Sequence, residues 1–346
     1  MSERGSTRRG VIVGALAALA GGSSGQTRGP RTRLVDETAW KQQRIRTLAA
    51  MQEVMGSLPP RKSDPPEMAT LEEVPSQDSI RKKIAFASGD GERVPAYLMM
   101  PRGTGPFPAM LCLHQTTAIG KAEPAGLGGK PNLHYAQELA ARGFVTLAPD
   151  YPGFGDYKID AYALGYASAT MKGIHNHMEA VDLLAAMSSV DPLRIGVIGH
   201  SLGGHNSLFV AVFEPRLRAV VTSCGFTSFA KYYKGDLTGW SHRGYMPRIA
   251  EVYGKSPRNM PFDFPDVLAA IAPRPIFINA PLKDANFDVS GVDDCVAEAR
   301  SVYQDVFHAG DRLAVVHPDC AHDFPPDIRE QAYRFLERNL NPQANG

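Results

Sequence analysis

The stretch Arg194-Ile195-Gly196-Val197-Ile198-Gly199-His200-Ser201-Leu202-Gly203 decides the fold. It begins as a short apolar run typical of a buried strand, passes through Gly-x-Ser-x-Gly, and continues as a helical pattern to Val212. Glycines on both sides of Ser201 let the chain turn sharply, so that the serine hydroxyl stands exposed. The stretch therefore predicts a strand, a tight turn carrying a candidate nucleophile, and a helix.

A second copy of the pattern lies at residues 21–25, where no apolar strand precedes it. The turn exposes its serine only when a strand leads into it and a helix leads out. Ser201 alone has that setting.

Eight short runs, bounded by turn residues, have the composition of strands. They are residues 81–87, 94–100, 109–114, 144–148, 194–199, 219–223, 275–280 and 313–317. The first two are joined by a hairpin-like turn, whereas the later ones alternate with helical patterns, as parallel crossovers do. Those patterns cover residues 133–142, 174–188, 202–212, 292–308 and 328–340. This is the α/β-hydrolase plan, a mostly parallel, doubly wound sheet, here with eight strands.

The segments before this sheet have a different character. Residues 38–55 have apolar residues at roughly helical spacing, and the Pro-rich stretch 59–75 is expected to form no regular element. We predict a leader at residues 1–29, a helix and linker at 30–79, and one catalytic domain at 80–346.

The N-terminal leader resembles a twin-arginine export signal. Arg8 and Arg9 precede an apolar run, residues 11–20, that is too short to cross a bilayer. The leader therefore predicts a periplasmic or secreted protein without a stable membrane anchor. If the leader is only a basic tail, the protein is cytoplasmic.

Composition narrows the class of partner. The chain has 346 residues, 43% of them hydrophobic, and a formal net charge of +1, so nothing in it favours nucleic acid or acidic membranes. Cysteines at 112, 224, 295 and 320 lack paired metal-ligand spacing, so we expect no zinc site. Their pairing and the oligomeric state stay open.

A serine nucleophile needs a base, and in this fold the acid and then the histidine follow the serine along the chain. His322 lies in a loop after the last strand, which makes it the candidate base. Asp284 follows the strand 275–280 and is the favoured acid, with Asp288 as the alternative.

The oxyanion of an acyl-transfer intermediate needs two backbone N–H donors. Leu202, directly after the nucleophile, is one candidate. The second lies in the loop after His114, at Gln115 or Thr116, and the sequence leaves the choice between them open.

A long insert, residues 225–270, separates two of the expected strands and is rich in aromatic residues. We consider it a cap that walls the site and contacts substrate through Trp240 and Tyr245. The alternative is that its aromatic residues only pack the insert onto the body of the domain.

Five stretches carry a family resemblance: residues 114–116, 148–155, 199–204, 272–275 and 321–324. In these the chain resembles the dienelactone hydrolase-related, acetyl xylan esterase-like branch of the α/β-hydrolase superfamily. The resemblance implies hydrolysis of a small-molecule or carbohydrate ester through an acyl-serine intermediate, without metal or organic cofactor. Dienelactone hydrolases proper use a cysteine at the turn, so Ser201 favours ordinary esters.

Two other functions stay open. A serine exopeptidase of the prolyl oligopeptidase type shares the turn and the order of the three residues. A binding protein that kept the fold without its chemistry is the third hypothesis, and the presence of all three residue types in order argues against it.

Overall fold

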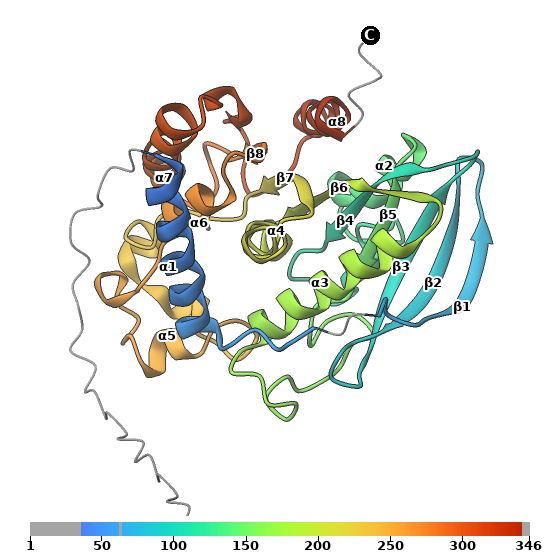
Figure 1. Ribbon diagram of the computed structural model, residues 1–346, viewed down its shortest axis with the longest axis horizontal. Coiled ribbons are helices and arrows are strands. Elements are labelled where there is room, and N and C mark those ends of the chain that lie inside the picture. Colours follow the sequence, from blue (N-terminus) through green and yellow to red (C-terminus); the bar gives the residue numbers. More distant parts are fainter. Residues whose placement is uncertain (1–35, 62–63, 341–346) are drawn as a thin grey trace, which may run out of the picture.

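The protein is described from a computed structural model, which covers residues 36–61 and 64–340 (Figure 1). A single twisted sheet forms the middle layer, with helices on both of its faces. The expected leader at residues 1–29 lies outside the described residues.

Within the described residues, the sheet has nine strands. They are β1 (Met68–Pro75), β2 (Ser79–Ala87), β3 (Arg93–Pro101), β4 (Phe107–Leu113), β5 (Val145–Pro149), β6 (Val190–His200), β7 (Leu217–Ser223), β8 (Ile276–Asn279) and β9 (Leu313–Val316). Their order across the sheet is β1-β2-β3-β5-β4-β6-β7-β8-β9. The pairings from β1 to β5 are antiparallel, and all those from β5 onward are parallel. This is the α/β-hydrolase fold, as predicted.

The expectation of eight strands, with no regular element in residues 59–75, was wrong for β1. This strand is hydrogen-bonded to β2 along one edge only, and all of its side chains are exposed or half-buried. Because neither face is buried, the segment has no alternation of apolar and polar residues that would signal a strand. Its prolines at 65, 66 and 75 lie before the strand or at its last position, where they cost no ladder hydrogen bond.

The helices cover the two faces unequally. The main ones are α1 (Glu37–Met55), α2 (Tyr135–Ala141), α3 (Ala169–Ala186), α4 (Leu202–Phe213), α5 (Arg248–Glu251), α6 (Phe264–Ile271), α7 (Val289–Ser301) and α8 (Pro326–Leu340). Buried side chains of α3, α4, α6 and α7 form one core with the sheet, and those of α2 and α8 form a second core on the opposite face. The N-terminal helix α1 packs against α6, where the indole Nε1–H of Trp40 donates to the carbonyl of Ala269 at 2.8 Å.

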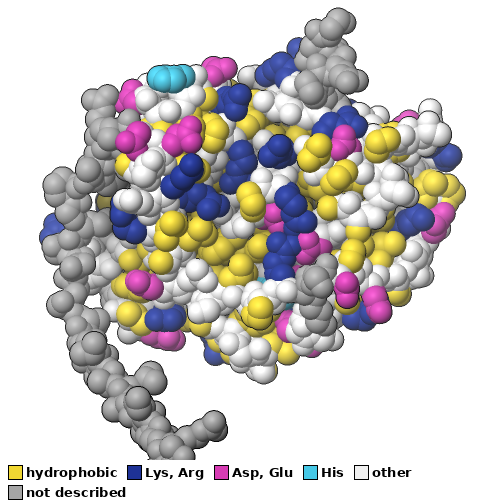
Figure 2. Space-filling model, viewed as in Figure 1, with side chains coloured by type: hydrophobic (Ala, Val, Ile, Leu, Met, Phe, Trp, Pro, Cys, Tyr) yellow, Lys and Arg dark blue, Asp and Glu magenta, His cyan; other side chains and the backbone are white. Residues whose placement is uncertain are grey.

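The face shown in Figure 2 agrees with the balanced composition. Acidic, basic and apolar side chains are interspersed on the face shown in Figure 2. Within residues 36–61 and 64–340, no helix is both long and apolar enough to span a bilayer.

The central strands are apolar on both faces, since each lies between helices, and this burial fixes their position in the sheet. Because β4 and β6 to β9 run parallel, the loops that follow them emerge at one edge. Ligands bind at this carboxyl edge in open α/β sheets. The candidate residues at 115–116, 201, 284 and 322 all lie in these loops.

Candidate active site

Ser201 occupies a strained turn between β6 and α4. Its backbone has φ 54° and ψ −115°, a left-handed φ that is unfavourable for a residue with a side chain. The turn is tied to the neighbouring strand, because the N–H of Ser201 donates to the carbonyl of Ser223 at 2.8 Å. A strained serine held in this way is typical of a functional position rather than of a packing one.

The two glycines of the motif are required by close backbone approach. A Cβ at Gly199 would overlap the carbonyl of Gly203, and a Cβ at Gly203 would overlap the carbonyl oxygen of Leu113 at the end of β4. Backbone carbonyls cannot move aside as the end of a flexible side chain can. The strand, turn and helix therefore fit together only with glycine at both positions.

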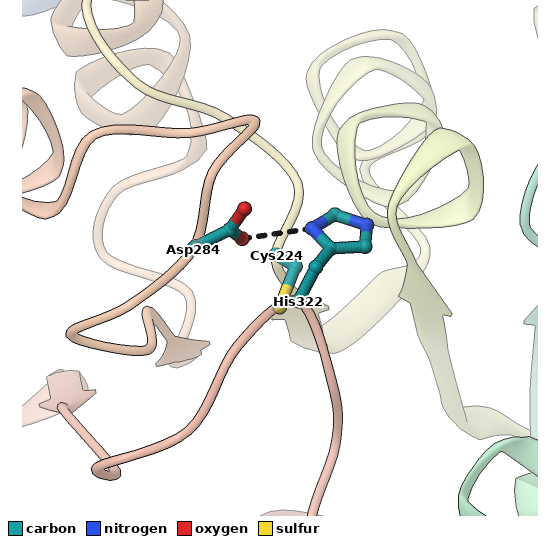
Figure 3. A group of neighbouring side chains, drawn as sticks. All are labelled: Cys224, Asp284 and His322. Atoms are coloured by element: carbon teal, nitrogen blue, oxygen red, sulfur yellow. Dashed lines mark hydrogen bonds and ion pairs between the residues drawn. The ribbon is translucent and has the colours of Figure 1, made fainter.

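His322 and Asp284 are joined by a hydrogen bond, drawn in Figure 3. The ring Nδ1 of His322 lies 2.8 Å from Oδ2 of Asp284. The other carboxylate oxygen of Asp284 accepts the backbone N–H groups of Asn286 at 2.8 Å and Phe287 at 3.2 Å. The Asp284 side chain is 1% exposed and that of His322 is 17% exposed, so the pair is held in a largely water-free setting with the ring still accessible.

Asp288, the alternative acid, is engaged elsewhere. It caps the N-terminus of α7, where its Oδ1 accepts the N–H of Ser290 at 2.8 Å and the Ser290 hydroxyl at 2.6 Å. These hydrogen bonds lower the pKa of the Asp288 carboxyl. The structure thus pairs His322 with Asp284 and gives Asp288 a capping contact.

A buried histidine supports the ring of His322 from the side. The rings of His200 and His322 meet edge to face with centroids 4.8 Å apart. His200 Nδ1 lies 2.9 Å from the Ser223 hydroxyl. Burial, together with the nearby His322, lowers the pKa of His200 well below its ordinary value, so this ring is neutral.

Cys224 lies beside the pair, at the end of β7. Its φ is 48°, and its thiol donates to the carbonyl of Asp323, the residue after His322, at 3.4 Å. Burial, and then the negative charge of Asp284, raise the pKa of the Cys224 thiol. Cys112, Cys224 and Cys320 are free thiols.

A pocket of about 290 Å³ opens over Ser201 and His322. The residues that line it are Gln115, Thr116, Ser201, Leu202, His205, Tyr232, Gly239, Trp240, Tyr245, Asn286, Phe287 and His322. The structure therefore brings seven of the eight predicted site residues to one cavity, and places the eighth, Asp284, behind His322.

The chain is similar to known proteins both in sequence and in fold. Residues 132–290 match the sequence profile of the prolyl oligopeptidase family. The chain is 28% identical over 302 residues to the Bacillus subtilis protein named "Putative hydrolase YtaP", covering 83% of this chain and 96% of that one. A glucuronoyl esterase from Solibacter usitatus superposes with a TM-score of 0.70, at 19% identity, over 91% of this chain and 99% of that structure.

Acetyl xylan esterase 1 from Thermoanaerobacterium superposes with a TM-score of 0.56, at 19% identity, over 89% of this chain and 95% of that structure. The chain therefore has the α/β-hydrolase fold of these structures. Structural similarity at this level of identity establishes the fold, and the chemistry has to be argued from the site.

The loop that carries Gln115 and Thr116 is held from both sides. His114 lies 2.6 Å from the Gln115 carbonyl through Nδ1, and its Nε2 accepts the N–H of Tyr151 at 2.9 Å. The Thr116 hydroxyl lies 2.8 Å from the hydroxyl of Tyr245 in the insert. His114 therefore has a structural role, and Thr116 joins the loop to the insert.

The aromatic insert, residues 225–270, both packs onto the body of the domain and lines the pocket. Phe229, Phe262 and Phe264 are buried against Phe209 of α4 or against one another. Tyr232, Trp240 and Tyr245 reach the pocket beside Ser201. The two roles are not exclusive, because Trp240 lines the pocket and also packs against Phe229 and Phe264.

Sequence reasoning missed His205, Tyr232, Asn286 and Phe287. Helical spacing was a usable signal for His205, because residues four apart share a face of a helix and the His205 N–H donates to the Ser201 carbonyl at 3.1 Å. Burial lowers the pKa of His205 to about 3, so the ring lining the pocket is neutral. Asn286 and Phe287 line the pocket and also hold Asp284 through backbone N–H groups, a contribution that no side-chain pattern reveals.

Proposed function

We propose that this protein hydrolyses carboxylic esters through an acyl-enzyme on Ser201. The observation that carries the proposal is the hydrogen bond between Asp284 and His322 at the wall of the pocket into which the strained Ser201 turn opens. A nucleophile, a base and a group that orients the base are the minimum for nucleophilic catalysis by serine.

The geometry supports a different role for each of the two ring nitrogens of His322. With Nδ1 bonded to Asp284, the neutral ring carries its proton there and leaves Nε2 free as an acceptor. As Ser201 attacks the ester carbonyl, Nε2 takes the hydroxyl proton and later gives it to the departing alcohol. Water then attacks the acyl-enzyme as Nε2 takes one of its protons, the bond between the acyl group and Ser201 breaks to release the acid, and Nε2 returns the proton to Ser201.

Charge that develops on the carbonyl oxygen needs fixed donors. The N–H of Leu202 begins the 12-residue helix α4, so the positive end of the helix dipole lies at the reacting centre. The N–H of Gln115 or Thr116 is the second proposed donor, and the hydrogen bonds around His114 hold that loop in place.

The lining of the pocket supports a small ester as substrate. A volume of about 290 Å³, walled by aromatic residues such as Trp240 and Tyr245, suits a short acyl group or one sugar-sized alcohol. The glucuronoyl and acetyl xylan esterases among the similar structures support a carbohydrate ester within that class. Turnover of p-nitrophenyl esters of increasing acyl length, compared with acetylated sugars, tests both statements.

A serine exopeptidase is the second candidate, favoured by the match of residues 132–290 to the prolyl oligopeptidase family. Turnover rates measured on an aminoacyl-arylamide and on an aryl ester of the same acyl group distinguish the two functions. Faster turnover of the ester supports the esterase, whereas equal turnover of both substrates supports the peptidase.

We also propose export by the twin-arginine route, on the sequence of the leader alone. Expression of the full chain in a bacterium with two membranes, followed by fractionation, tests it. Replacement of Arg8 and Arg9 by lysine is expected to retain the protein in the cytoplasm.

A further inference from the structure

We propose that Cys224, Asp284 and His322 form an inhibitory binding site for a soft divalent cation such as Zn²⁺ or Cd²⁺. The inference rests on the proposed function, because inhibition requires that His322 acts as the base. It concerns an ion that stops the hydrolase, not a cofactor that the reaction uses.

The geometry for such a site is already present. One ligand atom from each of the three residues lies within 4.8 Å of the other two. Figure 3 shows Cys224 beside the hydrogen bond that joins Asp284 to His322. Nδ1 of His322 and Oδ2 of Asp284 are 2.8 Å apart, so they need to separate only slightly to share a metal ion.

The donor set determines the class of ion. A thiolate, an imidazole nitrogen and a carboxylate oxygen are the ligands of zinc and of other soft or borderline metals, and zinc takes three protein ligands with water in its fourth position. Mg²⁺ and Ca²⁺ prefer oxygen ligands and are excluded by the sulfur.

The three ligands come from loops after β7, β8 and β9, which are adjacent parallel strands. The cysteines lack paired spacing along the chain, and for that reason we expected no zinc site. This spacing does not exclude the present cluster, because the sheet brings its three ligands together.

Metal binding would disable His322 through its tautomer. When the ion bonds to Nδ1, the proton that sat there is lost from that atom, and the neutral ring carries a proton on Nε2 instead. The thiol of Cys224 gives one proton to water as its sulfur bonds to the metal, which is the only net proton released. An Nε2 that already holds a proton cannot accept one from Ser201, so the acyl-enzyme cannot form.

The test separates binding from inhibition. Metal-free protein is titrated with Cd²⁺ while the ultraviolet charge-transfer absorption of a Cd–thiolate bond is followed, and turnover of p-nitrophenyl acetate is measured against Zn²⁺. We expect one Cd²⁺ bound per chain, loss of at least nine-tenths of turnover with Zn²⁺, recovery with a chelator, and no effect of Mg²⁺.

Cys320→Ser is the matched control, since Cys320 is the half-exposed cysteine nearby. It is expected to keep both the absorption and the inhibition. Cys224→Ser is expected to lose the absorption and to raise the inhibitory Zn²⁺ concentration at least about tenfold.

Loss of the Cd²⁺ absorption in Cys320→Ser would overturn the proposal, even if Cys224→Ser fails to fold. Unchanged Zn²⁺ inhibition in a folded Cys224→Ser protein would also overturn it. If the intact protein shows no esterase turnover, the Cd²⁺ titration still decides whether the site exists, so failure of the proposed function is recognised separately.

Discussion

Nδ1 of His322 lies 2.8 Å from Oδ2 of Asp284, and the second oxygen of that carboxylate is held by two backbone N–H groups. The carboxylate therefore orients the imidazole from a fixed position. Asp288, four residues further on, has an unrelated capping contact, which provides a matched pair of variants.

Asp284→Asn is expected to lower kcat by about 10³- to 10⁴-fold, because the amide keeps the shape but favours the wrong tautomer of His322. Asp288→Asn is expected to leave kcat within about twofold, since asparagine also caps helices well. Steady-state kinetics on p-nitrophenyl acetate measure both. Equal losses in the two variants would contradict the assignment of Asp284.

Gly203→Ala is expected to prevent correct folding of the turn, because the new Cβ overlaps the carbonyl oxygen of Leu113. We expect a loss of at least about 3 kcal/mol in the free energy of unfolding, as for severe overpacking. Gly254→Ala is the control: its φ is +60° but nothing lies within 4 Å of the added Cβ. Its expected cost is only about 1 kcal/mol of backbone strain, and urea denaturation compares the two.

Acid is expected to destabilise the folded protein below about pH 6.5. Burial lowers the pKa of His177 and of His205 to about 3 and that of His175 to about 4, from an ordinary value of 6.5. As the pH falls below 6.5 the unfolded chain takes up these protons while the folded chain does not. The free energy of unfolding therefore falls by about 1.4 kcal/mol per pH unit for each such histidine.

Urea denaturation between pH 7 and pH 4.5 measures this slope. His205→Phe is expected to reduce this slope by the contribution of one histidine, about 1.4 kcal/mol per pH unit, provided the variant folds. His308→Asn, at an exposed histidine, is expected to leave the slope unchanged. A stability that does not vary with pH in this range would contradict the burial of neutral rings.

Trp240 is expected to limit the length of the acyl group. It lines the pocket and its ring lies 4.7 Å from that of His205. Trp240→Phe removes part of this wall, so we expect kcat/KM for hexanoyl relative to acetyl esters to rise about tenfold. Trp40→Phe, at the only other tryptophan, which lies on α1 and does not line this pocket, is expected to leave the ratio unchanged. An unchanged ratio in Trp240→Phe would remove Trp240 from the substrate pocket.

The sequence was informative where local chemistry determines structure. A buried parallel strand is a continuous apolar run, and a sharp turn before a helix needs glycine, so the region around Ser201 could be predicted in detail. The loop positions of Asp284 and His322 followed from the chain order of the fold.

Other features depend on contacts between distant segments. Strand β1 is exposed on both faces and has no apolar pattern, so only its pairing with β2 reveals it. Asp284 and Asp288 have similar sequence settings, and the hydrogen bond to His322 distinguishes them. The approach of Cys224 to the same pair arises from the adjacency of β7 and β8, which the order of residues along the chain does not reveal.

The most direct test is turnover of p-nitrophenyl acetate by the intact protein and by Ser201→Ala, together with labelling of both by a serine-directed phosphonate. We predict turnover and labelling of the intact protein, with turnover at least about 10³-fold lower and labelling absent in the variant. Turnover that persists in Ser201→Ala would contradict the central claim that this serine carries the chemistry.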